Sequence, residues 1–339
     1  MFVHTEKEFL MTTARAQQIS LADTPYYHIM SRCVRRSYLC GTDKLTGQCY
    51  EHRRQWIEDR IRLLSTVFSI EICSYAVTSN HYHIVLKIDL ASTENWSFDE
   101  VIQRWLCLHK GPFLIQKYQK GDAIGVAEMN VMTRSVDDWR VRLASVSEFM
   151  QQLNQVIARQ ANIEENCTGR FWEVRFKSQP LLTEEALLTA MAYVDLNPVR
   201  ATMAATPEQS KHTSIRERIT PHFNLARALE NNPDFNHQYI QRFSVKPLAT
   251  LEGNVKYDNQ HGVLFSHNDY LSLIDTTSRI QRQTSAGLYL IHSCQYYNAL
   301  ILMLRNGLKI RRNLKQFFIQ NLITDVKQFS GFLKKTRLL

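Results

Sequence analysis

Residues 81–88 constrain the fold more than any other stretch, because side chains that favour a core recur at every second position. One side of an extended chain carries Tyr82, Ile84, Leu86 and Ile88. The other side carries His81, His83, Val85 and Lys87. A period of two residues is typical of a β-strand that buries one face. The segment therefore predicts a sheet with an apolar face toward a core and two histidines on its opposite face.

Further elements follow from apolar periodicity and from residues that start or stop helices and strands. Strands are predicted at residues 26–34, 70–77, 81–88 and 171–182. Helices are predicted at 49–69, at 98–108, from 145 onward and at 183–197. Residues 110–137 show no firm period and are expected to form loops. The order strand, helix, strand, strand, helices, strand, helix favours an antiparallel α+β sandwich over a parallel, doubly wound fold.

Two of these helices begin at capping signals. Ser145 and Glu148 fit a capping box, in which a serine and a glutamate satisfy free backbone amides. Thr183 precedes two glutamates, which matches an N-cap followed by an acidic first turn. Pro198 is expected to stop or kink the second helix, because proline has no amide hydrogen to donate.

The balance of charge narrows the class of partner. The 339 residues include 41 Lys and Arg against 32 Asp and Glu, a formal charge of +9, and the pI is near 9.2. Such an excess attracts polyanions, nucleic acid first among them. A basic protein without such a partner is the plain alternative. The seven cysteines are scattered and form no C-x-x-C pair, which argues against a disulfide framework and a cysteine zinc site.

Targeting segments are not evident in the sequence. There is no apolar run of about 18 residues, and residues 1–18 lack the apolar centre of a signal peptide. We therefore expect a cytoplasmic, nucleoid-associated protein with no membrane partner. The length favours two domains, or one domain with a sizeable extension.

His81 and His83 stand two residues apart on the predicted strand, so their imidazoles point the same way. Two neutral imidazoles side by side make half of a divalent-metal site. The pattern alone is weak, since two surface histidines often occur at this spacing by chance.

Tyr193 lies on the predicted helix 183–197, and Asn197 follows one turn along the same face. A tyrosine can act as a covalent nucleophile. The pKa of a phenol is ordinarily about 10, so a nucleophilic tyrosine needs a metal, a base or an electropositive site beside it. Most tyrosines are structural, and this residue alone does not establish the chemistry.

Three segments taken together resemble a known family. Residues 75–87 (YAVTSNHYHIVLK) resemble the HUH motif segment of the single-tyrosine transposases. Residues 169–179 (GRFWEVRFKSQ) and 193–201 (YVDLNPVRA) look like the downstream part of the same family. The similarity covers roughly residues 24–220, with 31–41 (SRCVRRSYLCG) at its start. Within the HUH superfamily, the chain most resembles the REP-associated tyrosine transposases.

This resemblance implies an RRM- or ferredoxin-like antiparallel sheet with helices on one face and the tyrosine helix beside the histidine strand. It implies that His81 and His83 bind Mg²⁺ or Mn²⁺ and that Asn197 assists the metal. It also implies that Tyr193 cuts single-stranded DNA through a 5′-phosphotyrosine intermediate and rejoins it to another 3′ hydroxyl. The expected activity is that of a metal-dependent strand transferase acting at hairpin-forming repeats.

Single-stranded DNA and DNA hairpins are the partners that the resemblance implies, and basic side chains are candidates for phosphate contacts. These candidates are Arg32, Arg35, Arg36, Arg170, Arg175, Lys177 and Arg200. Arg175 and Lys177 alternate with apolar residues and are expected to share a face. Tyr82, Trp172 and Phe176 can stack on bases or pack in the core, and core packing is the plainer role.

The expected organisation is an N-terminal arm at residues 1–22, a catalytic domain at 23–221 and a basic, helical C-terminal extension at 222–339. Residues 301–339 carry nine Lys or Arg against one acid, and 314–332 are expected to form an amphipathic helix. This charge fits either a solvated surface or phosphate contacts. The sequence leaves open whether the protein is a monomer or a homodimer.

Two other functions compete with the strand transferase. A domesticated, non-catalytic relative of the transposases would bind DNA hairpins without cutting them. A metal-dependent nuclease would use water and not Tyr193. The presence of His81, His83 and Tyr193 together favours the transferase.

Overall fold

The computed structural model describes residues 19–34, 39–43, 47–251, 263 and 265–284. Four strands form one sheet in the order β2-β3-β1-β4, and every pair in it is antiparallel. Their bounds are β1 Tyr26–Arg32, β2 Ile70–Val77, β3 His81–Ile88 and β4 Lys177–Pro180. β2 and β3 have the predicted bounds, and the three residues between them form the tight connection. The predicted α+β class is confirmed.

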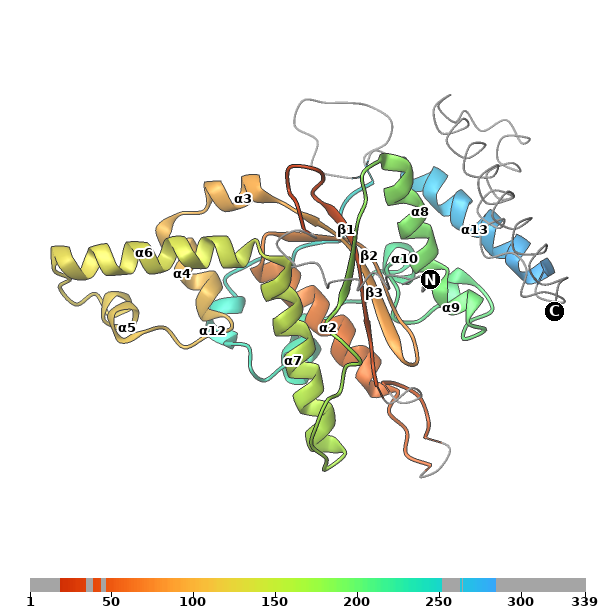
Figure 1. The fold of residues 1–339 in the computed structure, drawn as a ribbon, viewed down its shortest axis with the longest axis horizontal. Helices are drawn as coiled ribbons and strands as arrows, with labels where there is room; N and C mark the ends of the chain where they lie inside the picture. Colours follow the sequence, from red (N-terminus) through yellow and green to blue (C-terminus); the bar gives the residue numbers. More distant parts are fainter. Residues whose placement is uncertain (1–18, 35–38, 44–46, 252–262, 264, 285–339) are drawn as a thin grey trace, which may run out of the picture.

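Helices cover both faces of this sheet (Figure 1). The first face packs against α2 (His52–Val67) and α7 (Val146–Glu164), with Tyr27, Ile29 and Ile84 fully buried between them. α7 begins at its predicted N-cap, where the Oγ of Ser145 accepts a hydrogen bond from the amide of Glu148.

The second face packs against α8 (Glu184–Asp195), which contacts β2 and β3. Leu187, Met191 and Val194 of α8 are buried in a smaller core with Ala76 and Val85 of the sheet. The resemblance implied helices on one face only, and this expectation was wrong, because helices cover both faces. The reason is that Ala76 and Val85 are apolar on the same face as the histidines, so part of that face needs a cover.

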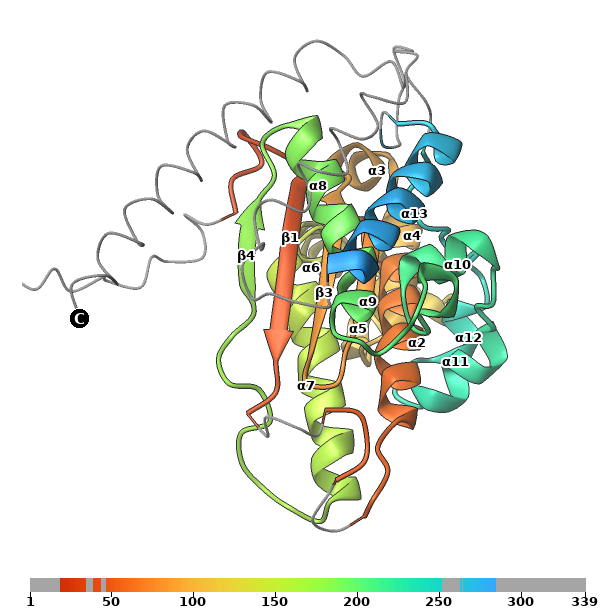
Figure 2. The ribbon, with the colours of Figure 1, turned by 90° about the vertical axis from the view of Figure 1, so that its right-hand side faces the viewer.

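The other helices in the described ranges are mostly short, and α6 and α13 are the two long ones. They are α3 Leu90–Asn95, α4 Phe98–Leu106, α5 Phe113–Gln119, α6 Val126–Leu143, α9 Asn197–Arg200, α10 Ser214–Ile219, α11 Leu225–Asn231, α12 His237–Ile240 and α13 His267–Thr284, with a 3₁₀ turn at Pro207–Gln209. Figure 2 shows β4 at the sheet edge beside β1 and α13 close to α8. None of the helices in the described ranges is long and apolar enough to cross a membrane.

The expectation of loops at 110–137 was wrong, because α5 and most of α6 occupy this stretch. α6 buries only one residue per turn, at Met132, Val136, Trp139 and Leu143. Exposed apolar residues at Val126, Val131 and Val141 break up this narrow stripe in the sequence. In Figure 1, α5 and the start of α6 lie at one end of the molecule, and α6 runs inward from there toward the core.

The predicted strand 171–182 was too long. Only Lys177–Pro180 pairs as a strand, while Trp172 makes an isolated bridge to Cys33. Phe171 and Phe176 are both buried although they stand five positions apart, an odd offset that a regular strand cannot place on one face.

The described residues from 222 on contain α11, α12 and α13, joined by irregular segments, and their first part belongs to the main core. Leu229, Phe235 and Ile240 are buried in the same cluster as the first face of the sheet. Arg60 of α2 is fully buried and donates to both carboxylate oxygens of Asp234 at 2.8 Å. The helix expected at 314–332 lies outside the described residues.

Candidate active site

Strand register gathers the predicted site residues on the second face of the sheet. Arg32 of β1 lies opposite His81 of β3, and Met30 lies opposite His83. On its other side, Met30 pairs with Lys177 of β4. Residues directly opposite in an antiparallel pair project to the same face. The two histidines therefore share one face with Arg32 and Lys177, whose side chains are exposed.

His28 is a third imidazole at this site, and the sequence analysis missed it. It lies on the same face of β1 as Met30, two residues earlier, and its Nε2 is 3.0 Å from Nδ1 of His83. The alternation of Tyr27 and Ile29 into the core was a signal that His28 faces the other way. The register between β1 and β3, which brings His28 to His83, cannot be read from the sequence.

His81 is held by the turn that precedes β3. Its Nδ1 is 2.6 Å from Oδ1 of Asn80 and 3.1 Å from Oγ1 of Thr78. Thr78 also donates to the backbone carbonyl of His81 at 2.7 Å, which closes the turn. Thr78 and Asn80 thus fix both the start of β3 and the ring of its first histidine.

Burial keeps all three histidines neutral near pH 7. It lowers the pKa of His83 to about 2, and repulsion from His28, His81, Arg32 and Arg200 adds to the effect. Burial also lowers the pKa of His28 to about 4. Burial and the charge of Arg32 lower the pKa of His81 to about 4. Neutral imidazoles keep a lone pair, which is the form that binds a metal ion.

Tyr193 reaches this cluster from α8. Its ring centroid lies 5.5 Å from that of His83 and 6.1 Å from that of His28, edge-on to both. α8 starts at Thr183, whose side chain accepts a hydrogen bond from the amide of Ala186, as the predicted N-cap requires. The apolar residues of α8 are buried against the sheet, and Tyr193 lies half-buried on the edge of that contact.

Asn197 does not lie on the same regular helix as Tyr193. α8 ends at Asp195, and Asn197 is the first residue of the short helix α9. Pro198 has no amide hydrogen, which explains the break. Asn197 is nevertheless only 8% exposed, and it lies just beyond the C-terminal end of α8, the end that carries Tyr193.

Arg200 is the basic candidate that lies against the predicted nucleophile. Its Cζ is 4.7 Å from the ring centroid of Tyr193. Its Nη1 is buried and has no hydrogen-bond partner within the described ranges. A buried guanidinium nitrogen without a partner is costly, and an anionic ligand would relieve that cost.

Two other basic candidates, Arg170 and Arg175, lie on the segment that precedes β4. Arg170 is exposed, and its Nη1 donates to the carbonyl of Glu173 at 3.2 Å. Arg175 is exposed but precedes β4, so the strand does not give it a common face with Lys177. Arg35 and Arg36 lie outside the described residues.

The aromatic candidates pack mainly in the core. Tyr82 is fully buried and Phe176 is 8% exposed. Trp172 is half-buried, and its indole Nε1 donates to the carbonyl of Asn154 at 2.8 Å. The expected core role is confirmed for Tyr82 and Phe176.

The donor set fits a divalent ion that phosphate and water complete. In the part of the chain that the structure describes, no three His, Cys, Asp or Glu side chains form a ready-made metal site. Nε2 of His83 is buried and lacks a hydrogen-bond partner among those residues. Buried polar atoms are normally satisfied, and a metal ion bound by this nitrogen would satisfy it. Mg²⁺ commonly takes few protein ligands and fills its shell with water and phosphate oxygens.

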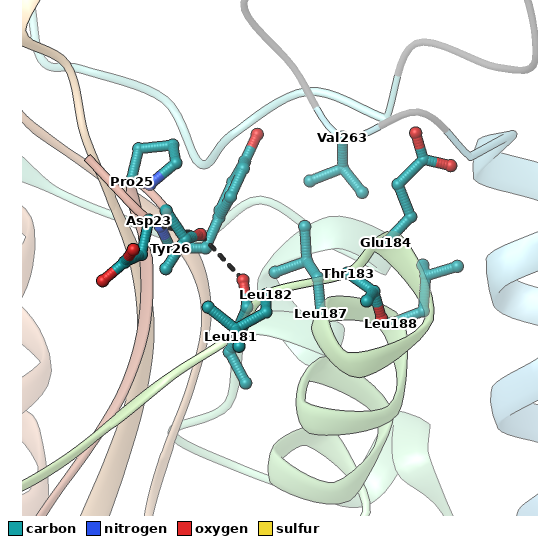
Figure 3. A pocket seen from close by; sticks show the side chains of 11 residues that line it. Asp23, Pro25, Tyr26, Leu181, Leu182, Thr183, Glu184, Leu187, Leu188 and Val263 are labelled. Atoms are coloured by element: carbon teal, nitrogen blue, oxygen red, sulfur yellow. Dashed lines mark hydrogen bonds between the residues drawn. The ribbon is translucent and has the colours of Figure 1, made fainter. Parts of the chain in front are cut away.

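A separate cavity of about 270 Å³ lies at the N-terminal end of α8 (Figure 3). Apolar side chains dominate its wall, and they include Pro25, Tyr26, Leu181, Leu187, Leu188 and Val263. Oγ1 of Thr24 donates to the carbonyl of Leu181 at 2.7 Å. No predicted site residue lines this cavity, which is distinct from the histidine cluster.

No family model matches the chain, and no curated protein matches it. One solved structure that it resembles is a REP-associated tyrosine transposase bound to a REP hairpin. The two chains are 12% identical, the likeness covers 63% of this chain and 90% of that one, and the TM-score is 0.36. The likeness is distant, and the function proposed below rests on the residues of the site itself.

Proposed function

We propose that this chain is a metal-dependent enzyme that cuts and rejoins single-stranded DNA, with Tyr193 as the nucleophile. The observation that carries the proposal is the convergence of Tyr193 of α8 with His83 of β3, at 5.5 Å between ring centroids. Two elements far apart in the sequence thus bring a phenol and neutral imidazoles to one place, with Arg200 beside them. The motif resemblance over 75–87 and 193–201 supports the same chemistry.

His81 and His83 would hold the metal, with Asn197 as a further ligand from the start of α9. A bound Mg²⁺ or Mn²⁺ would polarise a non-bridging phosphate oxygen and stabilise the charge that develops there. Burial keeps both imidazoles deprotonated on one nitrogen, so that a proton does not compete with the ion near pH 7.

The phenol oxygen of Tyr193 would form the new bond to phosphorus while the bond from phosphorus to the 3′ oxygen breaks. The phenol proton ends, in net terms, on the departing 3′ hydroxyl. The product is a 5′-phosphotyrosine ester, which preserves the energy of the broken phosphodiester for rejoining. Arg200 lies against the tyrosine ring and is placed to attract the scissile phosphate.

We propose single-stranded DNA with an imperfect hairpin as the substrate. Arg32 and Lys177 project from the site's own face of the sheet, and exposed basic side chains of this kind bind a phosphate backbone. Arg170 and Arg175 would continue this track along the segment before β4.

A cleavage assay with one matched set of variants separates the competing functions. The probe is a labelled single strand with an imperfect hairpin, taken from the DNA that flanks the gene of this chain, with Mg²⁺ or Mn²⁺. Cleavage that disappears in Tyr193→Phe and in His83→Ala supports the proposal. Cleavage that survives Tyr193→Phe indicates a nuclease that uses water. Tight binding without cleavage in either metal indicates a hairpin-binding protein.

A further inference from the structure

We propose that His28 is a positioning residue that accepts a hydrogen bond from Nδ1 of His83 and so leaves Nε2 of His83 to bind the metal. This inference rests on the proposed function, because it assigns a role toward the metal of that site. The carrying observation is the distance of 3.0 Å between Nε2 of His28 and Nδ1 of His83, two residues 55 positions apart.

The contact is built into the sheet. His28 and His83 stand on neighbouring strands, and the register places His83 opposite Met30, two residues along from His28. Their ring centroids are 5.1 Å apart with an interplanar angle of 30°. His83 is 2% exposed, so its ring has little freedom to turn toward other partners. The strand pairing therefore fixes which nitrogen of His83 meets His28.

The tautomer of His83 follows from its surroundings. A neutral imidazole carries one proton, and either Nδ1 or Nε2 bears it. If Nδ1 bears the proton, this N–H donates a hydrogen bond to Nε2 of His28, and Nε2 of His83 keeps its lone pair. If Nε2 bears it, a buried N–H is left without an acceptor among the described residues. Such an orphaned donor is costly, and the Nδ1–H form avoids this cost when a metal takes the lone pair.

His81 shows the same arrangement with a different acceptor. Its Nδ1 is 2.6 Å from Oδ1 of Asn80, and an amide oxygen can only accept. Nδ1 of His81 is therefore the donor, and its Nε2 keeps the lone pair. Metal-binding histidines in proteins generally donate their other nitrogen to an outer partner of this kind. His28 would do for His83 what Asn80 does for His81.

Histidine nitrogen spectra of the full chain test the tautomer directly. In long-range ¹H–¹⁵N spectra of the ¹⁵N-histidine-labelled protein, we expect His83 to carry its proton on Nδ1, and Nε2 to show the signature of an unprotonated nitrogen. Added Mg²⁺ should move the Nε2 signal of His83. A proton on Nε2, or metal shifts at Nδ1 of His83 together with Nε2 of His28, would overturn the assignment.

Variants of His28 test the consequence for the metal. We expect His28→Phe to weaken Mn²⁺ binding roughly 10- to 100-fold by calorimetry, since it removes the acceptor. His28→Gln supplies an amide oxygen and should restore most of the affinity, which a purely structural role would not explain. His237→Gln, an exposed histidine on α12, is the matched control and should bind as the wild type.

Unchanged Mn²⁺ affinity in a folded His28→Phe variant would contradict the positioning role. If the wild type binds no Mn²⁺, the proposed metal-dependent function fails, while the nitrogen spectra still decide whether His28 sets the tautomer of His83. The two failures are therefore distinguishable.

Discussion

Arg200 and Tyr193 form a pair that has a natural control elsewhere in the chain. The guanidinium carbon of Arg200 lies 4.7 Å from the centroid of Tyr193, and that of Arg242 lies 5.1 Å from the centroid of Tyr239. The two pairs are alike in geometry, but only the first adjoins the histidines. A loss of activity specific to Arg200 would therefore reflect the site and not the stacking of an arginine on a tyrosine.

We expect Arg200→Ala to slow DNA cleavage roughly 100-fold, because it removes a positive charge placed for the developing phosphate charge. Arg200→Lys should keep part of the rate, since it retains the charge but loses the planar fork. Single-turnover cleavage of the labelled hairpin measures both, with Arg242→Ala as the control. Wild-type rates in Arg200→Ala would show that this side chain has no part in the reaction.

At this scale, the sequence could predict the identity of some site residues and not of others. Alternation along β3 places His81 and His83 on one face, and the structure has them there. His28 carries the same alternation signal within β1, but its importance depends on a contact with another strand. Buried partners such as Asp195 are also invisible in the sequence, because their role arises only from packing between distant helices.

Among the elements, the α8–α9 segment is anchored by a buried carboxylate two residues after Tyr193. Asp195 is fully buried at the end of α8. Its oxygens accept hydrogen bonds from the hydroxyl of Tyr270 at 2.5 Å, from the amide of Ile215 at 2.9 Å and from the hydroxyl of Ser214. Tyr270 belongs to α13, so one hydrogen bond ties the C-terminal extension to the helix that carries Tyr193.

We expect Tyr270→Phe to lower the free energy of unfolding by about 1–3 kcal/mol, because it leaves one oxygen of the buried Asp195 short of a donor. Urea unfolding followed by circular dichroism measures this change. Tyr118→Phe removes an exposed tyrosine hydroxyl that donates to Asp99 at 2.9 Å. This control should stay within about 0.5 kcal/mol of the wild type. Equal effects of the two substitutions would show that the Asp195 contact does not anchor α13.

Elements with a strong period could be predicted, and those with a diluted one could not. β3 has a clean alternation, β2 is a nearly unbroken run of buried residues, and the bounds of both were predicted correctly. α6 has a one-residue-per-turn stripe interrupted by exposed valines, and it was missed. The order of the strands in the sheet depends on non-local pairing, which no local pattern encodes.

At the scale of the whole molecule, a buried network around Glu58 of α2 connects elements that lie far apart in the sequence. Glu58 accepts hydrogen bonds from Nδ1 of His212 at 2.6 Å, from Nε2 of His222 at 2.8 Å and from the hydroxyl of Tyr75 at 2.7 Å. The hydroxyl of Tyr75 also lies 2.8 Å from Oε2 of Glu217. This network joins α2, β2, α10 and the segments that flank α10. It therefore connects the predicted catalytic domain to the first residues of the extension.

The network makes stability sensitive to acid. Burial alone would raise the pKa of Glu58, but the hydrogen bonds from His212, His222 and Tyr75 outweigh it and lower the pKa to about 2. Because this pKa lies below that of the unfolded chain, the stabilisation is present above about pH 4.5 and is lost as the pH falls toward about 2. The pKa of His222 is raised by its bond to Glu58, so its contribution is present in acid and is lost as the pH rises through that raised value.

We expect the free energy of unfolding to fall by about 2 kcal/mol through Glu58 as the pH is lowered from about 4.5 to about 3. Urea unfolding at a series of pH values measures this slope. Glu58→Gln has no carboxylate to protonate and should show a flatter profile over the same range. An identical slope in the wild type and in Glu58→Gln would place the acid sensitivity elsewhere.

The division of the chain at residue 221 stays a proposal. Leu229 and Phe235, in the first part of the extension, are buried in the main core. The ion pair between Arg60 of α2 and Asp234 also links the residues before 221 to those after it. The sequence suggested a boundary there because its motifs end, but the end of a motif does not mark the end of a hydrophobic core. The basic segment 301–339, for which phosphate contacts were one expectation, lies outside the described residues.

Mass spectrometry of the protein after reaction with the hairpin strand in Mg²⁺ tests whether Tyr193 is the nucleophile. We expect a peptide that contains Tyr193 and carries a 5′-linked nucleotide on its phenol oxygen. The adduct should be absent in Tyr193→Phe and present in Tyr118→Phe. A nucleotide on any other residue, or DNA cleaved with no adduct on the protein at any time, would contradict this expectation.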